Sequence, residues 1–367
     1  MTLVTNSPQF DFTIGARKHQ DNSENWDSVF WFGSGREAIY ATIRALEKIK
    51  GTVMLPAYVP EGVYAPFYDS DWDIQYYDLN ADLSPDAKSI QAALELSCNV
   101  NFVVCIHYFG IISDLSEVSQ LVKSHGAVMV EDMSHVLPNE TLSYGDYGEI
   151  ILYSLPKVIG VPDGALCQFK TEELLAAISK FETSSPKSWY LLQRIVILAT
   201  ANLTATSWCT PTVADKIGYV VGGVFNSYKS LMRNYRQPSR ASAVAQYIYF
   251  RTDILKAGTR KQEAFLEYQK SICNENVGKP ELENKTLLGG FGYPLVVRDV
   301  TKVIEKFKER NIKVTTLKNR WCFLQEDDYK YFPISIHFLR HHVILPTSEH
   351  LKKEQIFEIA DIVNEEI

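Results

Sequence analysis

Short apolar segments alternate with amphipathic segments along most of the 367-residue chain, and this alternation restricts the fold more than any other feature. The apolar segments have the length and near-continuous hydrophobicity of strands that are buried on both faces. The amphipathic segments repeat apolar residues at helical spacing, as Ile39, Ile43 and Leu46 do. Strands that alternate with helices form βαβ units, in which helices cover a parallel sheet. The sequence therefore predicts an α/β fold with a mostly parallel central sheet.

Residues that end helices or strands mark the limits of these segments. Gly51 and Gly126 follow two helical segments, and Pro56 ends the first clear strand. Residues 170 to about 270 are expected to be mainly helical. We expect strands at 52–56, 73–79, 101–110, 127–132, 148–155 and 165–170, and helices at 36–50, 84–94 and 114–126.

Changes in composition divide the chain into three expected parts. Residues 1–29 are polar and weakly periodic, which indicates an N-terminal arm. A large domain follows over 30–273, and a polar, glycine-containing stretch at 274–292 begins a small C-terminal α+β domain over 274–367. In the small domain we expect strands at 293–297, 312–317 and 341–346, and helices at 300–311 and 354–367.

Composition and charge exclude several classes of protein. With 46% hydrophobic and 22% charged residues the chain is globular. Lys and Arg total 37 against 44 Asp and Glu, a net charge of -7, which does not fit a nucleic-acid-binding protein. The most apolar stretch, 189–209, contains Gln193 and Arg194 and is too polar for a membrane span. Partners are therefore expected to be small molecules or a second copy of the chain.

The expected compartment follows from the cysteines and the N-terminus. Six cysteines are scattered without a CxxC pair, which favours reduced thiols and indicates no metal site. The first residues contain no apolar core of a secretory signal. We expect a soluble, cytoplasmic protein.

Four polar segments fall where an open α/β sheet binds ligands, beyond the carboxyl ends of its strands. They are 32–37, 128–135, 153–157 and 233–239. The first is rich in glycine at a helix start, which suits an anion, although it matches no nucleotide motif. Each segment also has an ordinary explanation as a turn, a loop cap, a solvent-exposed lysine or a helix entry.

Two residues in these segments could carry chemistry. A carboxylate at the end of a buried strand, Asp132, is costly unless a cation or a donor accompanies it. Lys157 could point to solvent, or it could occupy a pocket where desolvation lowers its pKa and exposes the neutral amine. The residues alone leave both interpretations open.

The order of the motifs adds a resemblance. The succession SGREAI, LPAYVPEG, IHYFG, VEDMSH, YGDYG, SLPK with VPDGA, and NYRQP resembles the DegT/DnrJ/EryC1/StrS family of aminotransferases. The resemblance covers about Phe30 to Tyr249 and continues in VILPTSEHLKKEQIFEIADIV. It implies a pyridoxal-phosphate (PLP) enzyme of fold type I, with a large and a small domain and a homodimer that shares its active sites.

The resemblance also implies roles for matching residues. Lys157 would bind the cofactor covalently and move a proton, and Asp132 would keep the pyridine nitrogen protonated. His135 would contact the 3-oxygen of the cofactor. The other implied cofactor contacts are Gly35, Arg36 and Glu37 of the phosphate loop, Tyr58 near the ring, Ser154 on the phosphate, and Asn234, which reaches the partner's cofactor in the dimer.

The chain departs from the usual motifs of this family at several positions. Arg36 replaces the threonine of a Ser-Gly-Thr phosphate loop, where a guanidinium can bind phosphate directly. Pro60 falls at the place of an aromatic residue that usually covers the cofactor ring. Ser154 lies only three residues before Lys157, and the segment 181–229 is unlike the shorter version in sugar enzymes.

The leading hypothesis is a PLP-dependent aminotransferase that moves an amino group from an amino acid, with glutamate as the expected donor, to a keto-sugar nucleotide or a related carbonyl compound. One alternative is another PLP enzyme, such as a dehydratase or an enzyme acting on amino-acid substrates. Another is a binding or regulatory protein without catalysis on the same fold. Arg236 and Arg340 are candidate substrate contacts.

Overall fold

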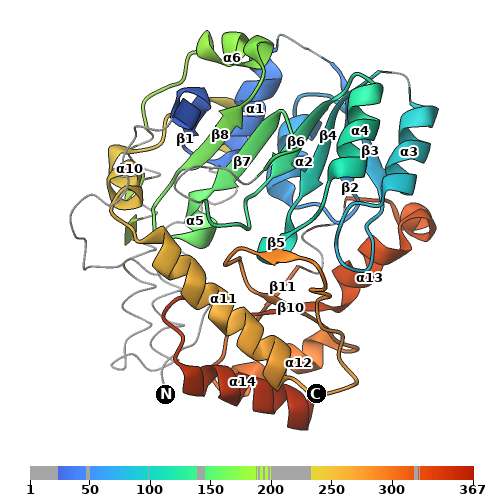
Figure 1. Ribbon diagram of the computed structural model, residues 1–367, viewed down its shortest axis with the longest axis vertical. Coiled ribbons are helices and arrows are strands. Elements are labelled where there is room, and N and C mark those ends of the chain that lie inside the picture. The colour runs from blue at the N-terminus through green and yellow to red at the C-terminus, as the bar shows by residue number, and fades with distance from the viewer. Residues whose placement is uncertain are drawn as a thin grey trace.

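The computed structural model describes residues 24–46, 50–97, 99–138, 145–186, 233–317, 321 and 323–367, with isolated positions between 188 and 199. Most of the expected N-terminal arm and most of the segment 181–229 lie outside the described residues. The mixed α/β architecture that the sequence predicts is confirmed (Figure 1).

A seven-stranded sheet forms the centre of the molecule, in the order β1-β8-β7-β6-β4-β2-β3. Strand β8 is antiparallel to its neighbours β1 and β7, and the other adjacent strands pair in parallel. The mostly parallel sheet is thus confirmed. Its strands are β1 (Val29–Phe32), β2 (Thr52–Pro56), β3 (Asp73–Tyr77), β4 (Val100–Ile106), β6 (Val128–Asp132), β7 (Ile150–Ser154) and β8 (Ala165–Phe169).

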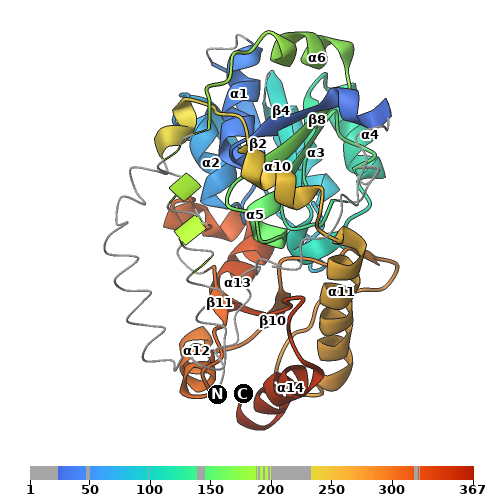
Figure 2. The same ribbon diagram turned by 90° about the vertical axis from the view of Figure 1, so that its left-hand side faces the viewer.

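Helices cover both faces of this sheet. Figure 2 shows α1 and α2 on one side of the strands and α3 and α4 on the other. Side chains at the helix starts fix several boundaries: Ser34 accepts a hydrogen bond from the backbone of α1, and Thr171 does the same for α6. These helices are α1 (Gly35–Ala45), α2 (Glu61–Tyr68), α3 (Ala87–Leu96), α4 (Ser116–Ser124) and α6 (Glu172–Ser179).

A three-stranded antiparallel sheet, in the order β10-β12-β11, organises the C-terminal part. Helices α11 and α14 contact each other beside this sheet (Figures 1 and 2). The expected strand at 312–317 is shorter than predicted. The elements are α11 (Ile254–Ser271), β10 (Tyr293–Val296), α12 (Val300–Glu309), β11 (Thr315–Thr316), α13 (Pro333–His341), β12 (His342–Leu345) and α14 (Lys353–Glu366).

Shorter elements connect these units. Helix α5 (Leu155–Val158) follows β7 directly, and α10 (Ala243–Tyr249) precedes α11. The two-stranded sheet of β5 (Ile111–Ile112) and β9 (Thr286–Leu287) joins the central sheet region to the C-terminal part. The 3₁₀ helices are η1 (Glu24–Ser28), η2 (Tyr108–Gly110), η3 (Arg233–Arg236) and η4 (Glu326–Tyr331).

The largest hydrophobic core joins the central sheet to the C-terminal part of the chain. Its buried members come from β2, β4, β6 and the helices on the sheet, and they include Leu317, Trp321 and Phe338. A second core lies among α11, α12, α14 and β10. C-terminal side chains therefore pack directly on the region where the parallel strands end.

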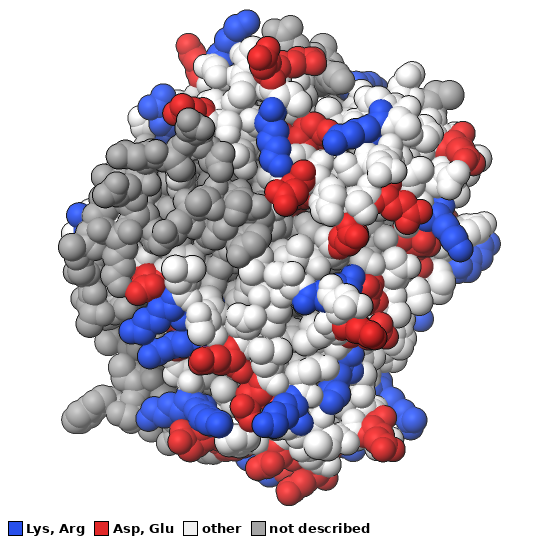
Figure 3. All heavy atoms as spheres, viewed as in Figure 1, with Lys and Arg blue, Asp and Glu red and all other residues white. Residues whose placement is uncertain are grey.

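The charges on the surface and the hydrophobicity of the helices indicate which kinds of partner are possible. On the face in Figure 3, acidic and basic side chains of the described residues are interspersed. Within the part of the chain that the structure describes, no helix combines the length and hydrophobicity needed to cross a membrane.

Candidate functional site

The predicted site residues of two strands meet at one edge of the central sheet. Strands β4, β6 and β7 are parallel neighbours, and Asp132 is paired with Ile106 on one side and Leu152 on the other. Asp132 is the last residue of β6, and Ser154 is the last residue of β7. Helix α5 begins immediately after Ser154 and carries Lys157. This is the edge at which open α/β sheets bind ligands.

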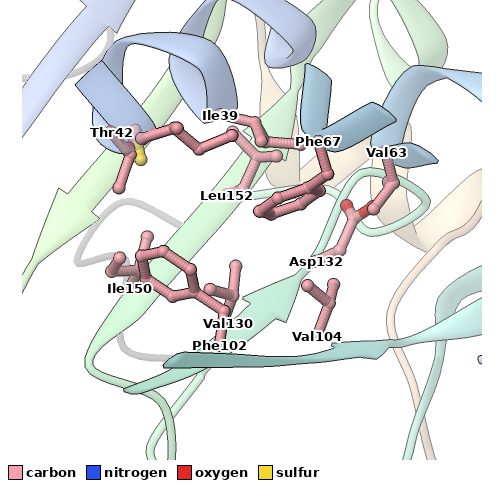
Figure 4. A pocket seen from close by; sticks show the side chains of 12 residues that line it. Ile39, Thr42, Val63, Phe67, Phe102, Val104, Val130, Asp132, Ile150 and Leu152 are labelled. Carbon is pink, nitrogen blue, oxygen red and sulfur yellow. The ribbon is translucent and has the colours of Figure 1, made fainter. Parts of the chain in front are cut away.

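Asp132 is a buried carboxylate in an apolar environment. Its side chain is 1% exposed, and its Oδ1 accepts a hydrogen bond of 2.8 Å from the backbone N–H of Ser134. No other hydrogen bond to this carboxylate is formed within the described ranges. Asp132 and Thr42 are the polar members of the lining of a cavity of about 20 Å³, otherwise formed by hydrophobic side chains (Figure 4). Such a carboxylate needs a nearby positive charge.

Lys157 supplies charge on the same edge. Its side chain is half-buried, and desolvation lowers the pKa of its amine. The Asp132 carboxylate acts in the opposite direction, whereas the Arg36 guanidinium lowers the pKa further. Asp132 and Arg36 are therefore each within electrostatic range of Lys157. A lysine whose pKa is lowered is a better nucleophile and proton acceptor near neutral pH.

The start of α1 has backbone amides of the kind that can bind an anion. The first amides of a helix have no intrahelical acceptors and carry partial positive charge. Ser34 Oγ accepts from the N–H of Glu37 at 3.3 Å, and Gly35 and Arg36 precede that capped amide. A Cβ placed on Gly62 would lie 3.4 Å from Arg36 Nε, so the Arg36 side chain lies against the start of α2.

Backbone hydrogen bonds connect the loop before α1 to the turn that carries Lys157. The N–H of Gly164 donates to the Gly33 carbonyl at 2.9 Å, and the Gly164 carbonyl accepts from the N–H of Leu155 at 3.1 Å. Ser154 is half-buried, and its hydroxyl forms no hydrogen bond to any residue of the described ranges. The structure thus brings the glycine-rich loop and the β7–α5 junction together, as the sequence predicts.

Glu37 lies buried inside the loop at the start of α1. Its carboxylate is 5% exposed and accepts hydrogen bonds from Ser34 Oγ at 3.2 Å and Ser239 Oγ at 3.1 Å. A Cβ on Gly33 would lie 2.4 Å from Glu37 Oε2, so a larger residue would disturb this arrangement. Glu37 shapes the loop from within, and its predicted direct contact with a cofactor stays a prediction.

His135 presents one defined ring nitrogen. The backbone N–H of Phe109 donates to His135 Nδ1 at 3.3 Å, which assigns the ring proton to Nε2. Burial, and secondarily the charge of Lys157, hold the pKa of His135 well below its usual range. The imidazole is therefore neutral at physiological pH, with Nε2 as a donor.

Aromatic rings from distant parts of the sequence enclose His135, and sequence reasoning missed them. Its ring stacks on Phe291 at a centroid distance of 4.6 Å and on Trp321 at 5.5 Å. Tyr58 belongs to the same cluster: it is fully buried, stacks on Tyr108 at 5.4 Å and lies 5.0 Å from Trp321. These contacts occupy the Tyr58 ring, and its expected contact with a cofactor stays a prediction.

Three further predicted residues lie on other elements. Asn234 is in η3, and its side chain lies outside the described residues. Arg236 forms an ion pair of 3.1 Å with Asp69 at the end of α2. Arg340 is exposed on α13, with its guanidinium 5.3 Å from the ring centre of Tyr329. The structure therefore gives both arginines partners of their own, apart from Asp132 and Lys157.

Comparison with known proteins finds a family model that matches part of the chain. Residues 28–191 match the model of the DegT/DnrJ/EryC1/StrS aminotransferase family. The match covers less than half of the 367 residues, and over this part the resemblance that the motifs indicate is confirmed. The matched part contains Arg36, Asp132 and Lys157, and the expectation of an aminotransferase-family enzyme is confirmed. No curated protein matches the sequence.

Solved structures of aminotransferases share the fold of this chain. The sugar aminotransferase CalS13 from Micromonospora echinospora is 13% identical with a TM-score of 0.68, and the match covers 100% of both chains. DesV from S. venezuelae is 14% identical with a TM-score of 0.65, covering 92% of this chain and 84% of that one. A Streptococcus pneumoniae protein described as a putative sugar aminotransferase in the PMP form is 11% identical with a TM-score of 0.68, covering 99% and 97%. The likeness confirms the predicted type I fold.

Proposed function

We propose that this chain is a PLP-dependent aminotransferase that moves an amino group from an amino-acid donor, glutamate, to a keto-sugar nucleotide or a related carbonyl compound. One observation carries the proposal: Lys157 is electrostatically coupled to Asp132 and Arg36 at the carboxyl ends of adjacent parallel strands. A lysine, a buried carboxylate and an anion-binding group are what a covalently bound, phosphorylated pyridine requires.

The residues present fit PLP at each of its polar groups. Asp132 is buried and makes a single hydrogen bond within the described residues, so its carboxylate suits a protonated ring nitrogen. The amides at the start of α1, the Arg36 side chain and the Ser154 hydroxyl suit the phosphate. His135 Nε2–H suits the ring oxygen. Lys157 is the amine for covalent attachment.

Each residue then has a physical task in the proposed reaction. When bound, PLP supplies a ring that withdraws electrons from the bond to be broken. Asp132 holds a positive charge at the ring nitrogen because a buried carboxylate is stabilised by it. Lys157 Nζ takes a proton from the substrate carbon and returns one to the cofactor side. The rings of Phe291 and Trp321 limit the access of water to His135.

The sugar-directed substrate class is supported by the family and by the solved structures, which include sugar aminotransferases. A homodimer with shared sites is supported by the resemblance of the NYRQP segment, which contains η3, to the family motif that reaches the partner's cofactor. Within one chain, Tyr235 packs on Tyr40 of α1 at 5.9 Å. We propose that Asn234 of each subunit completes the phosphate site of the other.

The test separates the two halves of the reaction. Purified protein loaded with PLP is mixed with L-glutamate, and the absorbance change of the cofactor and the release of 2-oxoglutarate are followed. Keto-sugar nucleotides are then added, and the aminated product is identified by mass spectrometry. We expect both halves in the wild type and in a Lys256→Ala control, and neither in Lys157→Ala. Bound PLP that no amino donor converts would contradict the proposal and favour the binding or regulatory alternative.

A further inference from the structure

Lys261 is a buried ammonium group that contacts the turn carrying Lys157. Its side chain lies in α11 with 4% of its surface exposed. Lys261 Nζ donates a hydrogen bond of 2.6 Å to the backbone carbonyl of Val158. Val158 directly follows Lys157 and is the last residue of α5. A buried charge is costly, so this contact must offset the loss of hydration.

Helix α5 needs such a contact because it is only one turn long. A four-residue helix is not stable by itself, and the carbonyls of its last turn lack intrahelical partners. The Leu155 carbonyl accepts a hydrogen bond of 2.9 Å from the N–H of Ile159, and the Val158 carbonyl accepts one from Lys261 Nζ. A cation at the carboxyl end of a helix also interacts favourably with the helix dipole. Lys261 therefore completes the end of the lysine turn.

Glu349 connects Lys261 to the C-terminal part of the chain. Its Oε2 lies 3.4 Å from Lys261 Nζ, its side chain is 12% exposed, and this oxygen accepts no hydrogen bond among the described residues. The ion pair is therefore the main compensation for this buried oxygen. Glu349 lies between β12 and α14, where Tyr268 of α11 also donates to the Pro346 carbonyl at 3.0 Å.

We propose that Lys261 is a positioning residue: its hydrogen bond to the Val158 carbonyl and its ion pair with Glu349 fix the orientation of the turn that presents Lys157. The inference rests on the proposed role of Lys157. Displacement of a reacting group by about 1 Å lowers rates by roughly 100-fold. Loss of the Lys261 contact should therefore slow the reactions of Lys157 without removing the fold.

The test replaces Lys261 with methionine, which keeps most of the side-chain length but has neither charge nor donor. In cofactor-free protein, amide hydrogen exchange of residues 155–161 reports the stability of the turn. After PLP is added, borohydride trapping at timed intervals and peptide mass spectrometry report the rate of attachment to Lys157. We expect exchange about 10-fold faster and trapping about 10-fold slower in Lys261→Met. Lys256→Met, an exposed position on the same helix, should match the wild type in both.

Wild-type exchange and trapping in folded Lys261→Met would overturn the proposal. A lower urea midpoint with unchanged trapping would overturn it as well, because a merely structural residue behaves in that way. If Lys261→Met does not fold, the same two measurements are made on the neutral Lys261→Gln variant, and they decide whether the proposal holds. If wild-type Lys157 is never trapped, the proposed function fails, and hydrogen exchange alone then decides whether Lys261 holds the turn.

Discussion

At the scale of single residues, the site depends on how its charges compensate one another. Asp132 is buried against an apolar cavity, and Lys157 and Arg36 are the cations coupled to one another beside it. The Asp132 carboxylate favours the ammonium form of Lys157, whereas the Arg36 guanidinium opposes it. Together with the desolvation of the amine, these charges leave a lysine of lowered pKa near a buried carboxylate.

Asp132→Asn removes the negative charge while nearly conserving the shape of the side chain. Asparagine can hydrogen-bond to a ring nitrogen but does not hold its proton there. We expect turnover to fall by about 100-fold or more, as for the loss of other preorganised electrostatic groups, with a smaller loss of cofactor affinity. Steady-state kinetics and cofactor titration measure the two effects, with Glu95→Gln on exposed α3 as control. Near-normal turnover would remove Asp132 from the reaction.

Arg36→Met tests the charge coupling through pH dependence. Removing a neighbouring positive charge favours the ammonium form, so the pKa of Lys157 should rise and its reactivity should begin at higher pH. Asp132→Asn should move the same midpoint to lower pH, because it removes the charge that favours the ammonium. The measurement is the rate of reductive methylation of Lys157 against pH in cofactor-free protein. Shifts in the same direction for both variants would refute the coupling.

At the scale of elements, close backbone contacts hold the ligand-binding edge. The turn at Tyr108–Gly110, whose Phe109 N–H orients His135, packs on Gly290. A Cβ on Gly290 would lie 2.0 Å from the Phe109 carbonyl oxygen, so Gly290→Ala must move this turn.

We expect Gly290→Ala to lower the free energy of unfolding by about 2 kcal/mol, as overpacking does. Gly258→Ala is the matched substitution in the second turn of α11, where the new Cβ would meet only Leu137 at an ordinary 3.5 Å. It should raise stability by about 0.5–1 kcal/mol through helix propensity. Urea unfolding of the three proteins compares them. A loss of stability in both variants, or in neither, would show that the Gly290 contact is not special.

The elements also show what a sequence can predict. Strands β2, β4, β6 and β7 were predictable because hydrophobic runs bounded by Gly or Pro record burial and boundaries locally. Helix α2 was missed because its prolines favour a turn; Pro60 instead precedes the first turn, and Val63, Pro66 and Phe67 are buried. Helix α13 was also missed, because a connection without a helix was expected between the strands at 312–317 and 341–346.

Contacts between distant residues were not predictable. Asp132 and Lys157 could be recognised because ordered motifs surround them. The stacking of His135 on Phe291 and Trp321, and the hydrogen bond from Lys261 to Val158, join positions far apart in the sequence. Periodicity describes only the environment along one element, so it carries no information about which distant side chains meet.

At the scale of the whole molecule, the proposed homodimer makes each site depend on two chains. A mixture of inactive Lys157→Ala and Asn234→Ala subunits would then contain heterodimers with one site in which both residues are wild type. We expect activity to return toward about one quarter of the wild-type value after subunit exchange at equal amounts, since half of the dimers have one good site of two.

Two differently tagged proteins, purified by both tags, verify that exchange has occurred. The Asn234→Ala protein alone must show a clear defect for the comparison to be valid. Verified heterodimers without recovered activity would mean that each site is built within one chain.

The central claim is that the carboxyl ends of β6 and β7 form a PLP site in which Lys157 is the point of covalent attachment. The most direct test is to incubate the wild-type protein with PLP, reduce it with borohydride, and map the labelled peptides by mass spectrometry. The account predicts one dominant label on Lys157, at close to one per chain, and its disappearance in Lys157→Ala. A stoichiometric label on another lysine, or labelling spread over exposed lysines with Lys157 unmodified, would contradict it.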